Sequence, residues 1–290
     1  MRTAVWDDYE VIDTTNGEKL ERFKNVILIR PDPQIIWKNP KQSPLWKKAD
    51  ARYIRSNTGG GHWQNFKNTP DSWVINYKDM AFNLKLMGFK HTGIFPEQAV
   101  NWDFIRQKIK NSKKQMNVLN LFAYTGAATV AALKAGAKVC HVDSSKGMVA
   151  WAKENIKLNN LEAAPVRFIV DDCVKFVKRE IRRNNKYDAI IMDPPSYGRG
   201  PKGETWRLED DIYEFLSLIS ELLSDDAGFV ILNSYTSGLS CAVMDYMLSM
   251  IIKNKFGGSV CSDEIGLKVT STGLTLPCGS SAIWSKNQSI

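Results

Sequence analysis

Apolar runs alternate with amphipathic segments over most of the chain after residue 116. Five short runs are apolar enough to be strands buried on both faces of a parallel sheet, at 118–122, 138–142, 166–170, 187–192 and 228–232. Segments with helical spacing lie between them, at 127–137, 144–160 and 211–223, and the segment 144–160 opens on serines suited to an N-cap. Strand alternating with helix in this way predicts a doubly wound α/β sheet.

The first 110 residues follow a different pattern. Short alternating stretches at 25–29 and 72–77 predict strands, and prolines and tryptophans are frequent around them. We expect a small β-rich domain with irregular loops, in which SNTGGGHW (56–63) is a mobile turn. The polar run at 110–115 is the expected boundary. The prediction is therefore a β-rich substrate-binding or cap domain at 1–110 and an α/β domain at 111–290.

Composition and charge narrow the class of protein. With 290 residues, 43% of them hydrophobic, the chain can bury a full core, and its net charge of +8 favours polyanionic partners such as nucleic acid. No apolar run approaches the roughly 20 residues that cross a bilayer, so we expect a soluble cytoplasmic protein without a membrane partner. Five scattered cysteines and three histidines, without a CxxC pair, predict neither a disulfide framework nor a metal site.

The residues that follow the predicted strands are candidates for ligand binding, because ligands of such sheets lie beyond the carboxyl ends of the strands. They are Gly126 after the first strand, Asp143 after the second, Asp171 and Asp172 after the third, and Asp193 with Pro194 and Pro195 after the fourth. Any one of them could be an ordinary turn or helix cap. No GxGxxG motif is present, which disfavours a dinucleotide and hence a nicotinamide dehydrogenase. Taken together, they predict an adenosine ligand without a pyrophosphate, namely S-adenosylmethionine.

Three segments also carry a family resemblance. The stretches 120–160, VDDCVKF (170–176) and YDAIIMDPPSYGRG (187–200) resemble the class I methyltransferases of the bacterial 23S rRNA large-subunit group, which includes 5-methylcytosine and guanine methyltransferases. The resemblance covers roughly 85–245. The segment FKHTGIFPEQAVNW (89–102) is also similar to the group. Gln98 is retained there, whereas Pro96, Glu97 and Ala99 differ from the residues of the group. It implies a Rossmann-like methyltransferase sheet, S-adenosylmethionine as cofactor and ribosomal RNA as substrate.

The resemblance also implies roles for single residues. Phe122, Tyr124, Thr125 and Gly126 would surround the methionine part, although Tyr124 could be simple packing. Asp143 would hold the ribose, Asp172 the adenine amine, and Asp193 the side toward the transferring methyl. The complete predicted cofactor set is Gln98, Phe122, Tyr124, Thr125, Gly126, Asp143, Ser144, Asp172, Cys173 and Asp193. Cys173 is also expected to be a small buried residue.

The Asp193-Pro194-Pro195 corner is the predicted catalytic element. Proline fixes its own φ and restricts the residue before it, so the Asp193 carboxylate and the Pro194 carbonyl become a rigid pair of acceptors. Such a pair suits an exocyclic amine, whose N–H groups become stronger donors as the nitrogen is methylated. The predicted catalytic residues are Asp193, Pro194, Pro195, Ser196 and Tyr197. A proline pair that merely ends a strand is the alternative.

Methylation at carbon 5 of a pyrimidine needs a cysteine thiolate. The 5-methylcytosine members of the resembling group have this cysteine after the fifth strand, where the alignment of LNSYTSGLS (232–240) places Thr236. We therefore favour a base nitrogen. The alternatives are a 5-methylcytosine enzyme with a displaced thiol at Cys241 or Cys173, both expected in the core, a methyltransferase acting on small molecules or proteins, and an RNA-binding module with an idle cofactor fold.

Basic residues give three candidate RNA contacts. The helix after Asp172 is basic on one face, at Lys175, Lys178, Arg179, Arg182, Arg183 and Lys186, and apolar at Val174, Val177 and Ile181. The loop 196–209 adds Arg199, Lys202 and Arg207 with the aromatic residues Tyr197 and Trp206. The first domain adds Trp37, Lys38, Lys41, Trp46, Lys47 and Lys48. Each set could instead be ordinary surface or core.

Overall fold

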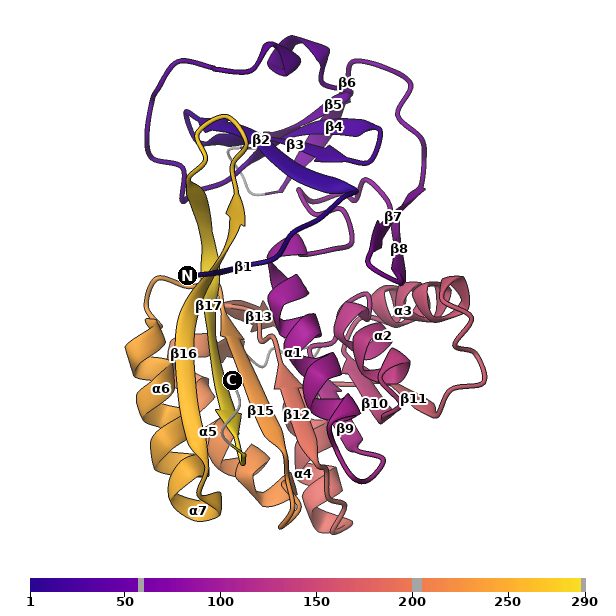
Figure 1. Ribbon diagram of the computed structural model, residues 1–290, viewed down its shortest axis with the longest axis vertical. Helices are drawn as coiled ribbons and strands as arrows, with labels where there is room; N and C mark the ends of the chain where they lie inside the picture. The colour runs from indigo at the N-terminus through magenta and orange to yellow at the C-terminus, as the bar shows by residue number, and fades with distance from the viewer. Residues whose placement is uncertain (57–59, 200–204, 288–290) are drawn as a thin grey trace. The chain divides into compact units, whose positions relative to one another are not determined.

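The computed structural model describes residues 1–56, 60–199 and 205–287 (Figure 1). The backbone divides into two compact units, the first made of Met1–Val100 and Ile265–Cys278, the second of Asn101–Glu264 and Gly279–Ile290. The predicted mobile turn at 56–63 includes residues 57–59, which lie outside the described ranges. Among the described residues, no helix combines the length and the apolar character needed to cross a bilayer.

The first unit is β-rich, as its sequence predicts. Its main sheet has the order β2-β3-β4-β5-β6, with strands Tyr9–Thr15, Glu18–Phe23, Val26–Pro31, Ala51–Arg55 and Gly61–Asn65. All neighbours in it are antiparallel except β4 and β5. The tight turn between β2 and β3 holds Asn16 and Gly17, both at positive φ, the conformation that a two-residue hairpin favours. A second hairpin joins β7 (Trp73–Tyr77) to β8 (Met80–Leu84).

A buried charge network stabilises the first unit. The Glu21 carboxylate is fully buried and accepts hydrogen bonds from the Arg30 guanidinium at 2.6 and 2.8 Å and from the Tyr9 hydroxyl at 2.6 Å. Burial alone would raise the pKa of Glu21, but Arg30, Lys19 and the hydrogen bonds lower it to about 2. Glu21 is therefore ionised, because its neighbours supply the hydrogen bonds and positive charge that water would otherwise supply.

The second unit is built on a mostly parallel sheet, and the α/β prediction is confirmed. The order of the eight strands is β1-β16-β17-β15-β12-β9-β10-β11, with β1 (Arg2–Thr3) paired to the part of β16 that belongs to the first unit. The five predicted strands are β9 (Asn117–Leu121), β10 (Lys138–Asp143), β11 (Val166–Val170), β12 (Ala189–Met192) and β15 (Phe229–Ser234). They are parallel, whereas β17 (Thr275–Ser285) runs antiparallel to β15, and β16 spans Ser259–Lys268.

Helices cover both faces of this sheet. Their bounds are α1 Ala99–Lys110, α2 Ala127–Lys134, α3 Lys146–Leu158, α4 Cys173–Arg182, α5 Leu208–Leu222, α6 Cys241–Leu248, a π-helical stretch Ser249–Lys253 and α7 Asn254–Phe256. Alternate residues of the strands, among them Leu119 and Ile190, pack with residues of α4, α5 and α6 in one apolar core. The opposite face of the strands carries Asn120 and His141. The hydroxyl of Thr129 in α2 forms a hydrogen bond of 3.0 Å with each of these side chains.

The order of winding positions the candidate site. The chain moves outward from β9 to β10 and β11, then returns to β12 on the other side of β9, so that Leu121 and Met192 lie opposite each other in adjacent strands. Ligands of such sheets bind at this reversal. The roles given to 1–110 and 111–290 remain predictions. The compact units themselves are discontinuous, because residues 265–278 of β16, β17 and their turn belong to the first unit.

Candidate cofactor and acceptor site

The loop after β9 has an unusual backbone. Phe122, Tyr124 and Gly126 have φ values of 54°, 50° and 83°. A left-handed conformation is uncommon for residues with a side chain, and observed cases concentrate at functional sites. The positive φ favours glycine at position 126, and a Cβ there would also make a tight contact, 3.0 Å from the Cβ of Ala152. This loop therefore brings its backbone close to the carboxyl edge of the sheet.

Asp143, at the end of β10, holds this loop. One of its carboxylate oxygens accepts a hydrogen bond from the backbone N–H of Tyr124 at 2.8 Å, and the other accepts one from Ser145 at 2.8 Å. Burial raises the pKa of Asp143, and these two bonds oppose that rise. Each oxygen keeps a second lone pair, so the carboxylate can still accept hydrogen bonds from two ribose hydroxyls. Ser145 caps α3, as its sequence predicts, and Ser144 is exposed.

Two further groups hold the same loop, and sequence reasoning did not identify either contact. The side-chain amide of Asn155, buried in α3, donates to the backbone carbonyl of Thr125 at 2.8 Å. The thiol of Cys173, which is 3% exposed, accepts from the backbone N–H of Phe122 at 3.3 Å. Burial raises the pKa of Cys173 far above that of an ordinary thiol. Cys173 is therefore a protonated, buried support of the loop, which agrees with its expected small buried character.

The acids after β11 are engaged in local structure. Asp172 caps α4 by accepting from the backbone N–H of Lys175 at 2.9 Å, which is the alternative reading of this residue from the sequence. Only one of its oxygens makes that bond, so the second can accept a donor from a ligand. Asp171 forms an ion pair with Arg179.

The Asp193-Pro194-Pro195 corner follows β12 and is held from one side by a hairpin of β13 (Tyr197–Arg199) and β14 (Thr205–Arg207). The indole N–H of Trp206 donates to the carbonyl of Pro195 at 2.7 Å. The Trp206 ring lies 5.7 Å from that of Phe122 and 5.6 Å from that of Phe215. Trp206 thus connects the proline corner to the loop after β9 and to α5. Sequence reasoning treated it only as a candidate RNA contact.

Other predicted residues of this corner differ in exposure. Pro194 is buried, Asp193 is half-buried, and Pro195 and Ser196 are exposed. The carbonyl of Ser196 accepts from the backbone N–H of Leu208 at 3.1 Å, which fixes the start of α5 beside the corner. Tyr197 is 51% exposed, so about half of its surface is accessible to a substrate.

The loop after β15 carries the position that aligns with a catalytic cysteine. There the hydroxyl of Thr236 donates to the carboxylate of Glu209 at 2.5 Å, and that bond lowers the pKa of Glu209. Gly238 lies against the same carboxylate, since a Cβ there would be 2.7 Å from its oxygen. Cys241 is the first residue of α6 and is only partly buried, less than the core position expected for it.

Several predicted residues lie elsewhere. Gln98 belongs to the first unit, where it is buried in the short 3-10 helix Pro96–Gln98. Lys202 and the side chain of Arg199 lie outside the description. The helix α4 ends at Arg182, so two cations of the predicted basic face lie past its end. Arg183, the C-cap, pairs with Glu180 at 3.2 Å, and the Lys186 ammonium donates to the Glu221 carbonyl at 2.6 Å. Because α4 runs back toward the amino ends of the strands, these two cations are separated from Asp172 by the length of the helix.

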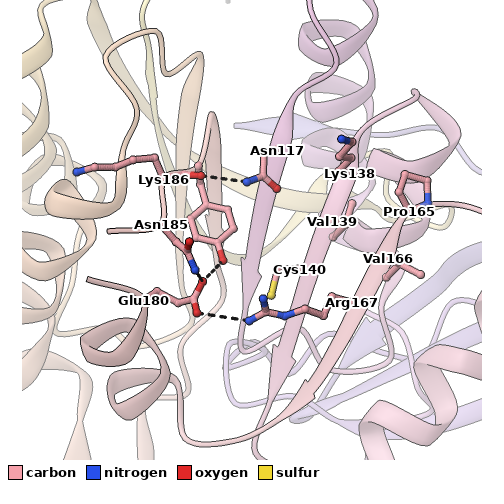
Figure 2. A pocket seen from close by; sticks show the side chains of 11 residues that line it. Asn117, Lys138, Val139, Cys140, Pro165, Val166, Arg167, Glu180, Asn185 and Lys186 are labelled. Carbon is pink, nitrogen blue, oxygen red and sulfur yellow. Dashed lines mark hydrogen bonds and ion pairs between the residues drawn. The ribbon is translucent and has the colours of Figure 1, made fainter. Parts of the chain in front are cut away.

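A cavity of about 400 Å³ opens at the amino ends of the strands (Figure 2). Figure 2 shows Glu180 at its wall, where the carboxylate accepts from the Tyr187 hydroxyl at 2.6 Å and from the Asn185 amide at 2.8 Å. Asn117, Lys138 and Val166, each at or near the start of a strand, line the same cavity. It is therefore at the opposite edge of the sheet from Asp143 and Asp193 and is a separate feature from the candidate site.

The candidate site fits an adenosine cofactor on the geometry of these residues. Three adjacent strands are followed by a left-handed Gly126, by an Asp143 carboxylate with spare lone pairs and by an Asp172 that caps α4 with one oxygen. These are the positions predicted from the sequence for close backbone approach, for the ribose and for the adenine amine. At these strand ends the sequence has no GxGxxG motif of a pyrophosphate loop.

Comparison with known proteins agrees with this geometry. Residues 50–247 match the model of the S-adenosylmethionine-dependent methyltransferase family. The ribosomal RNA large subunit methyltransferase K/L of Shewanella frigidimarina is 37% identical over 178 residues, which are 61% of this chain and 24% of that protein. The chain thus spans about a quarter of the length of the curated relatives it matches.

Solved structures agree as well. The SAM-dependent methyltransferase of Agrobacterium tumefaciens is 34% identical, with a TM-score of 0.92 over 98% of this chain and 93% of that one. A methyltransferase of Streptococcus mutans, at 19% identity and a TM-score of 0.72 over 96% and 75% of the two chains, shares the fold. The chain belongs to the S-adenosylmethionine-dependent methyltransferases.

Proposed function

We propose that this methyltransferase modifies a base of ribosomal RNA, at a nitrogen rather than at carbon 5. The names of the curated relatives and the net charge of +8 support an RNA substrate. One observation carries the choice of nitrogen, namely the hydrogen bond between Thr236 and Glu209 at the position where a carbon-5 enzyme needs its cysteine.

Carbon-5 methylation requires a thiolate that adds to the pyrimidine ring. At the aligned position this chain has a hydroxyl, a far weaker nucleophile, and its proton is already directed at the Glu209 carboxylate. The Cys173 thiol is buried, and its raised pKa keeps it protonated. A 5-methylcytosine enzyme would therefore have to recruit Cys241, which lies at the start of α6.

Bound S-adenosylmethionine supplies a methyl group made electrophilic by its sulfonium. We assign its ribose to the Asp143 carboxylate, its adenine amine to the second oxygen of Asp172 and its methionine part to the strained loop of residues 122–126. The remaining residues of the proposed cofactor set are Gln98, Ser144 and Cys173. Cys173 acts through its bond to Phe122, because it is itself almost fully covered.

Asp193 and Pro194 are the proposed acceptors for the substrate amine. Transfer of the methyl group to the substrate nitrogen, with the C–S electron pair left on sulfur, would give that nitrogen a positive charge. Two fixed acceptors stabilise the N–H groups most when that charge is largest, which lowers the barrier. The proton then leaves through the Asp193 carboxylate or to water. Proline geometry keeps both acceptors in place.

The rest of the proposed catalytic set orients the base. Pro195 and Ser196 fix the corner through the hydrogen bonds of their carbonyls to Trp206 and to the start of α5. Tyr197, with half of its side chain exposed, is the proposed platform on which an extruded base stacks.

Mass spectrometry of nucleosides tests this proposal. The purified protein is incubated with methyl-labelled S-adenosylmethionine and with rRNA from a strain that lacks its gene, and the digested RNA is analysed. We expect one labelled nucleoside with the methyl on a base nitrogen. Label on carbon 5 that disappears in Cys241→Ser would contradict the nitrogen assignment, and label only in protein or small molecules would contradict the RNA substrate.

A further inference from the structure

The connection between β4 and β5 is long for a compact unit (Figure 1). It covers residues 32–50 and contains only the 3-10 helix Pro44–Lys48. Connections longer than about 12 to 15 residues without much regular structure are uncommon and are usually functional or disordered. The hydrogen bonds that hold residues 32–50 and the side chains that they expose show whether this connection is ordered and functional.

Asp13 holds the second half of the connection. It is fully buried in β2, and one carboxylate oxygen accepts from the backbone N–H groups of Gln42 at 2.8 Å and Ser43 at 3.3 Å and from the indole N–H of Trp46 at 2.7 Å. The other oxygen accepts from the Ser271 hydroxyl at 2.7 Å. Burial alone would raise the pKa of Asp13, but these bonds lower it. An ionised buried carboxylate thus fixes the loop.

The first half is fixed to the end of β2. The indole N–H of Trp37 donates to the carbonyl of Thr14 at 3.1 Å, and the Trp37 carbonyl accepts from the backbone N–H of Asn16 at 2.9 Å. The Thr15 hydroxyl donates to the Asn39 carbonyl at 2.5 Å. Such a set of long-range hydrogen bonds makes the connection an ordered surface and leaves a functional role as the better explanation of its length.

What the connection exposes is apolar and basic. Ile36 is 82% exposed and Trp37 36%, although the adjacent Ile35 is buried. The same connection carries four exposed lysines, at Lys38, Lys41, Lys47 and Lys48, and no acidic residue occurs between Asp32 and Asp50. One of these ammonium groups, that of Lys41, lies 4.3 Å over the Trp46 ring. A single exposed apolar residue is common, but an isoleucine next to a partly exposed tryptophan, on a hydrogen-bonded loop rich in lysine, is the combination of apolar, aromatic and basic groups that single-stranded nucleic acid contacts.

We propose that this surface, the loop platform of Ile36, Trp37 and the lysines 38, 41, 47 and 48, binds a single-stranded part of the RNA substrate. The lysines neutralise phosphates and release their counterions. The Trp37 ring, held by its N–H and so ordered before binding, stacks with an unpaired base beside Ile36. The inference rests on the proposed RNA substrate and adds where the first unit contacts it.

The charge of the loop platform gives the first test. The triple variant Lys38→Gln, Lys47→Gln and Lys48→Gln is compared with a matched control, Lys110→Gln, Lys113→Gln and Lys157→Gln, whose lysines are exposed in the second unit. RNA affinity is measured over a range of salt concentrations with an rRNA fragment that the enzyme methylates. We expect the slope of log affinity against log salt to fall by about 2 in the platform variant, since each single-strand contact contributes about 0.7.

Trp37→Leu gives the second test. Removal of one stacking ring is expected to weaken RNA binding about tenfold or more. Calorimetric affinity for S-adenosylmethionine should stay unchanged in all these variants, which also shows that the second unit is folded. Circular dichroism and thermal unfolding verify the fold of the first unit.

Three results separate this inference from the proposed function. Wild-type protein that neither binds nor methylates rRNA would overturn the proposed function itself. If the platform variant methylates rRNA normally and its salt slope is unchanged, or if the control variant shows the same decrease in slope, the RNA-binding role of the loop platform is overturned but the proposed function is not. The third result concerns vesicles of phosphatidylcholine and phosphatidylserine. If the wild type sediments with them and the platform variant does not, while the variant still binds RNA normally, the platform is a membrane contact and the inference is overturned.

Discussion

Replacing Trp206 by phenylalanine should lower the rate of methyl transfer without weakening cofactor binding. The change removes the 2.7 Å hydrogen bond from the indole to the Pro195 carbonyl while it keeps an aromatic ring near Phe122 and Phe215. One such bond contributes about 1 kcal/mol. If that energy holds the proline corner in its reactive position, its loss should reduce kcat about fivefold.

Alanine at the same position should have a larger effect. Trp206→Ala also removes two aromatic contacts, each worth about 0.5 to 1.5 kcal/mol beyond the area they bury. The kcat is then expected to fall about 50-fold, provided that most of this energy holds the corner. Initial rates at saturating RNA give kcat, and calorimetry gives the dissociation constant of S-adenosylmethionine, which should change less than threefold in Trp206→Phe.

Trp284 offers a matched control for this prediction. Its indole also donates to a backbone carbonyl at 2.7 Å, that of Gly257, but it lies in the core on β17. Trp284→Phe should lower the free energy of unfolding and leave kcat within twofold. A kcat in Trp206→Phe that equals the wild-type value, or that falls no further than in Trp284→Phe, would refute the role of Trp206 in holding the corner.

Three other substitutions test separate parts of the structure. Asp193→Ala should keep the affinity for S-adenosylmethionine, measured by calorimetry, within tenfold of wild type and should abolish transfer of the labelled methyl group to RNA. Retained methyl transfer would show that the proline corner has only a structural role. Asp143→Ala should weaken S-adenosylmethionine binding about 100-fold, because two charge-assisted hydrogen bonds to the ribose are lost, and an unchanged dissociation constant would show that the ribose lies elsewhere. Arg30 and its neighbours hold the pKa of Glu21 in the folded protein at about 2, below its usual 4.5, so ionised Glu21 stabilises the fold by about 3 kcal/mol above pH 4.5 and this stabilisation is lost as the pH falls toward 2. The free energy of unfolding of Glu21→Gln, measured with denaturant, should lack that pH dependence. Wild type and variant whose free energies of unfolding change equally with pH would contradict this role of Glu21.

Sequence patterns predicted the sheet and the identity of the strand-end residues but not the contacts that hold them. Continuous apolar runs are characteristic of central parallel strands, so β9, β10, β11, β12 and β15 could be located within two residues. A serine before an amphipathic run likewise identified the cap of α3. These signals are local, since each depends on neighbours within a few positions.

The supporting contacts are long-range and leave no local pattern. Asn155 lies 30 residues from the carbonyl of Thr125 that it binds, and on its helix it is simply a polar residue among others. The contact of Trp206 with Pro195 depends on the pairing of two three-residue strands that are too short to show alternation. The anchoring of the 32–50 connection by Asp13 depends on partners that lie 29 and 258 residues further along the chain.

These contacts explain how a strained loop can be stable at the reactive edge. The left-handed conformations of Phe122 and Tyr124 cost about 1 to 2 kcal/mol each. Three hydrogen bonds, from Asn155 and to Asp143 and Cys173, each contribute about 1 kcal/mol and so offset most of that cost.

Asp143 both holds the loop and is proposed to bind the ribose, but Asn155 and Trp206 hold backbone without belonging to the proposed cofactor or catalytic sets, and this separation has a mechanistic consequence. Asn155, Cys173 and Trp206 bind backbone atoms of the two loops and fix where their carbonyl and N–H groups point. Because in-line methyl transfer depends on alignment more than on acid or base strength, such fixed backbone can supply much of the catalysis. A change at one of these supports should therefore reduce kcat while the reacting groups remain intact.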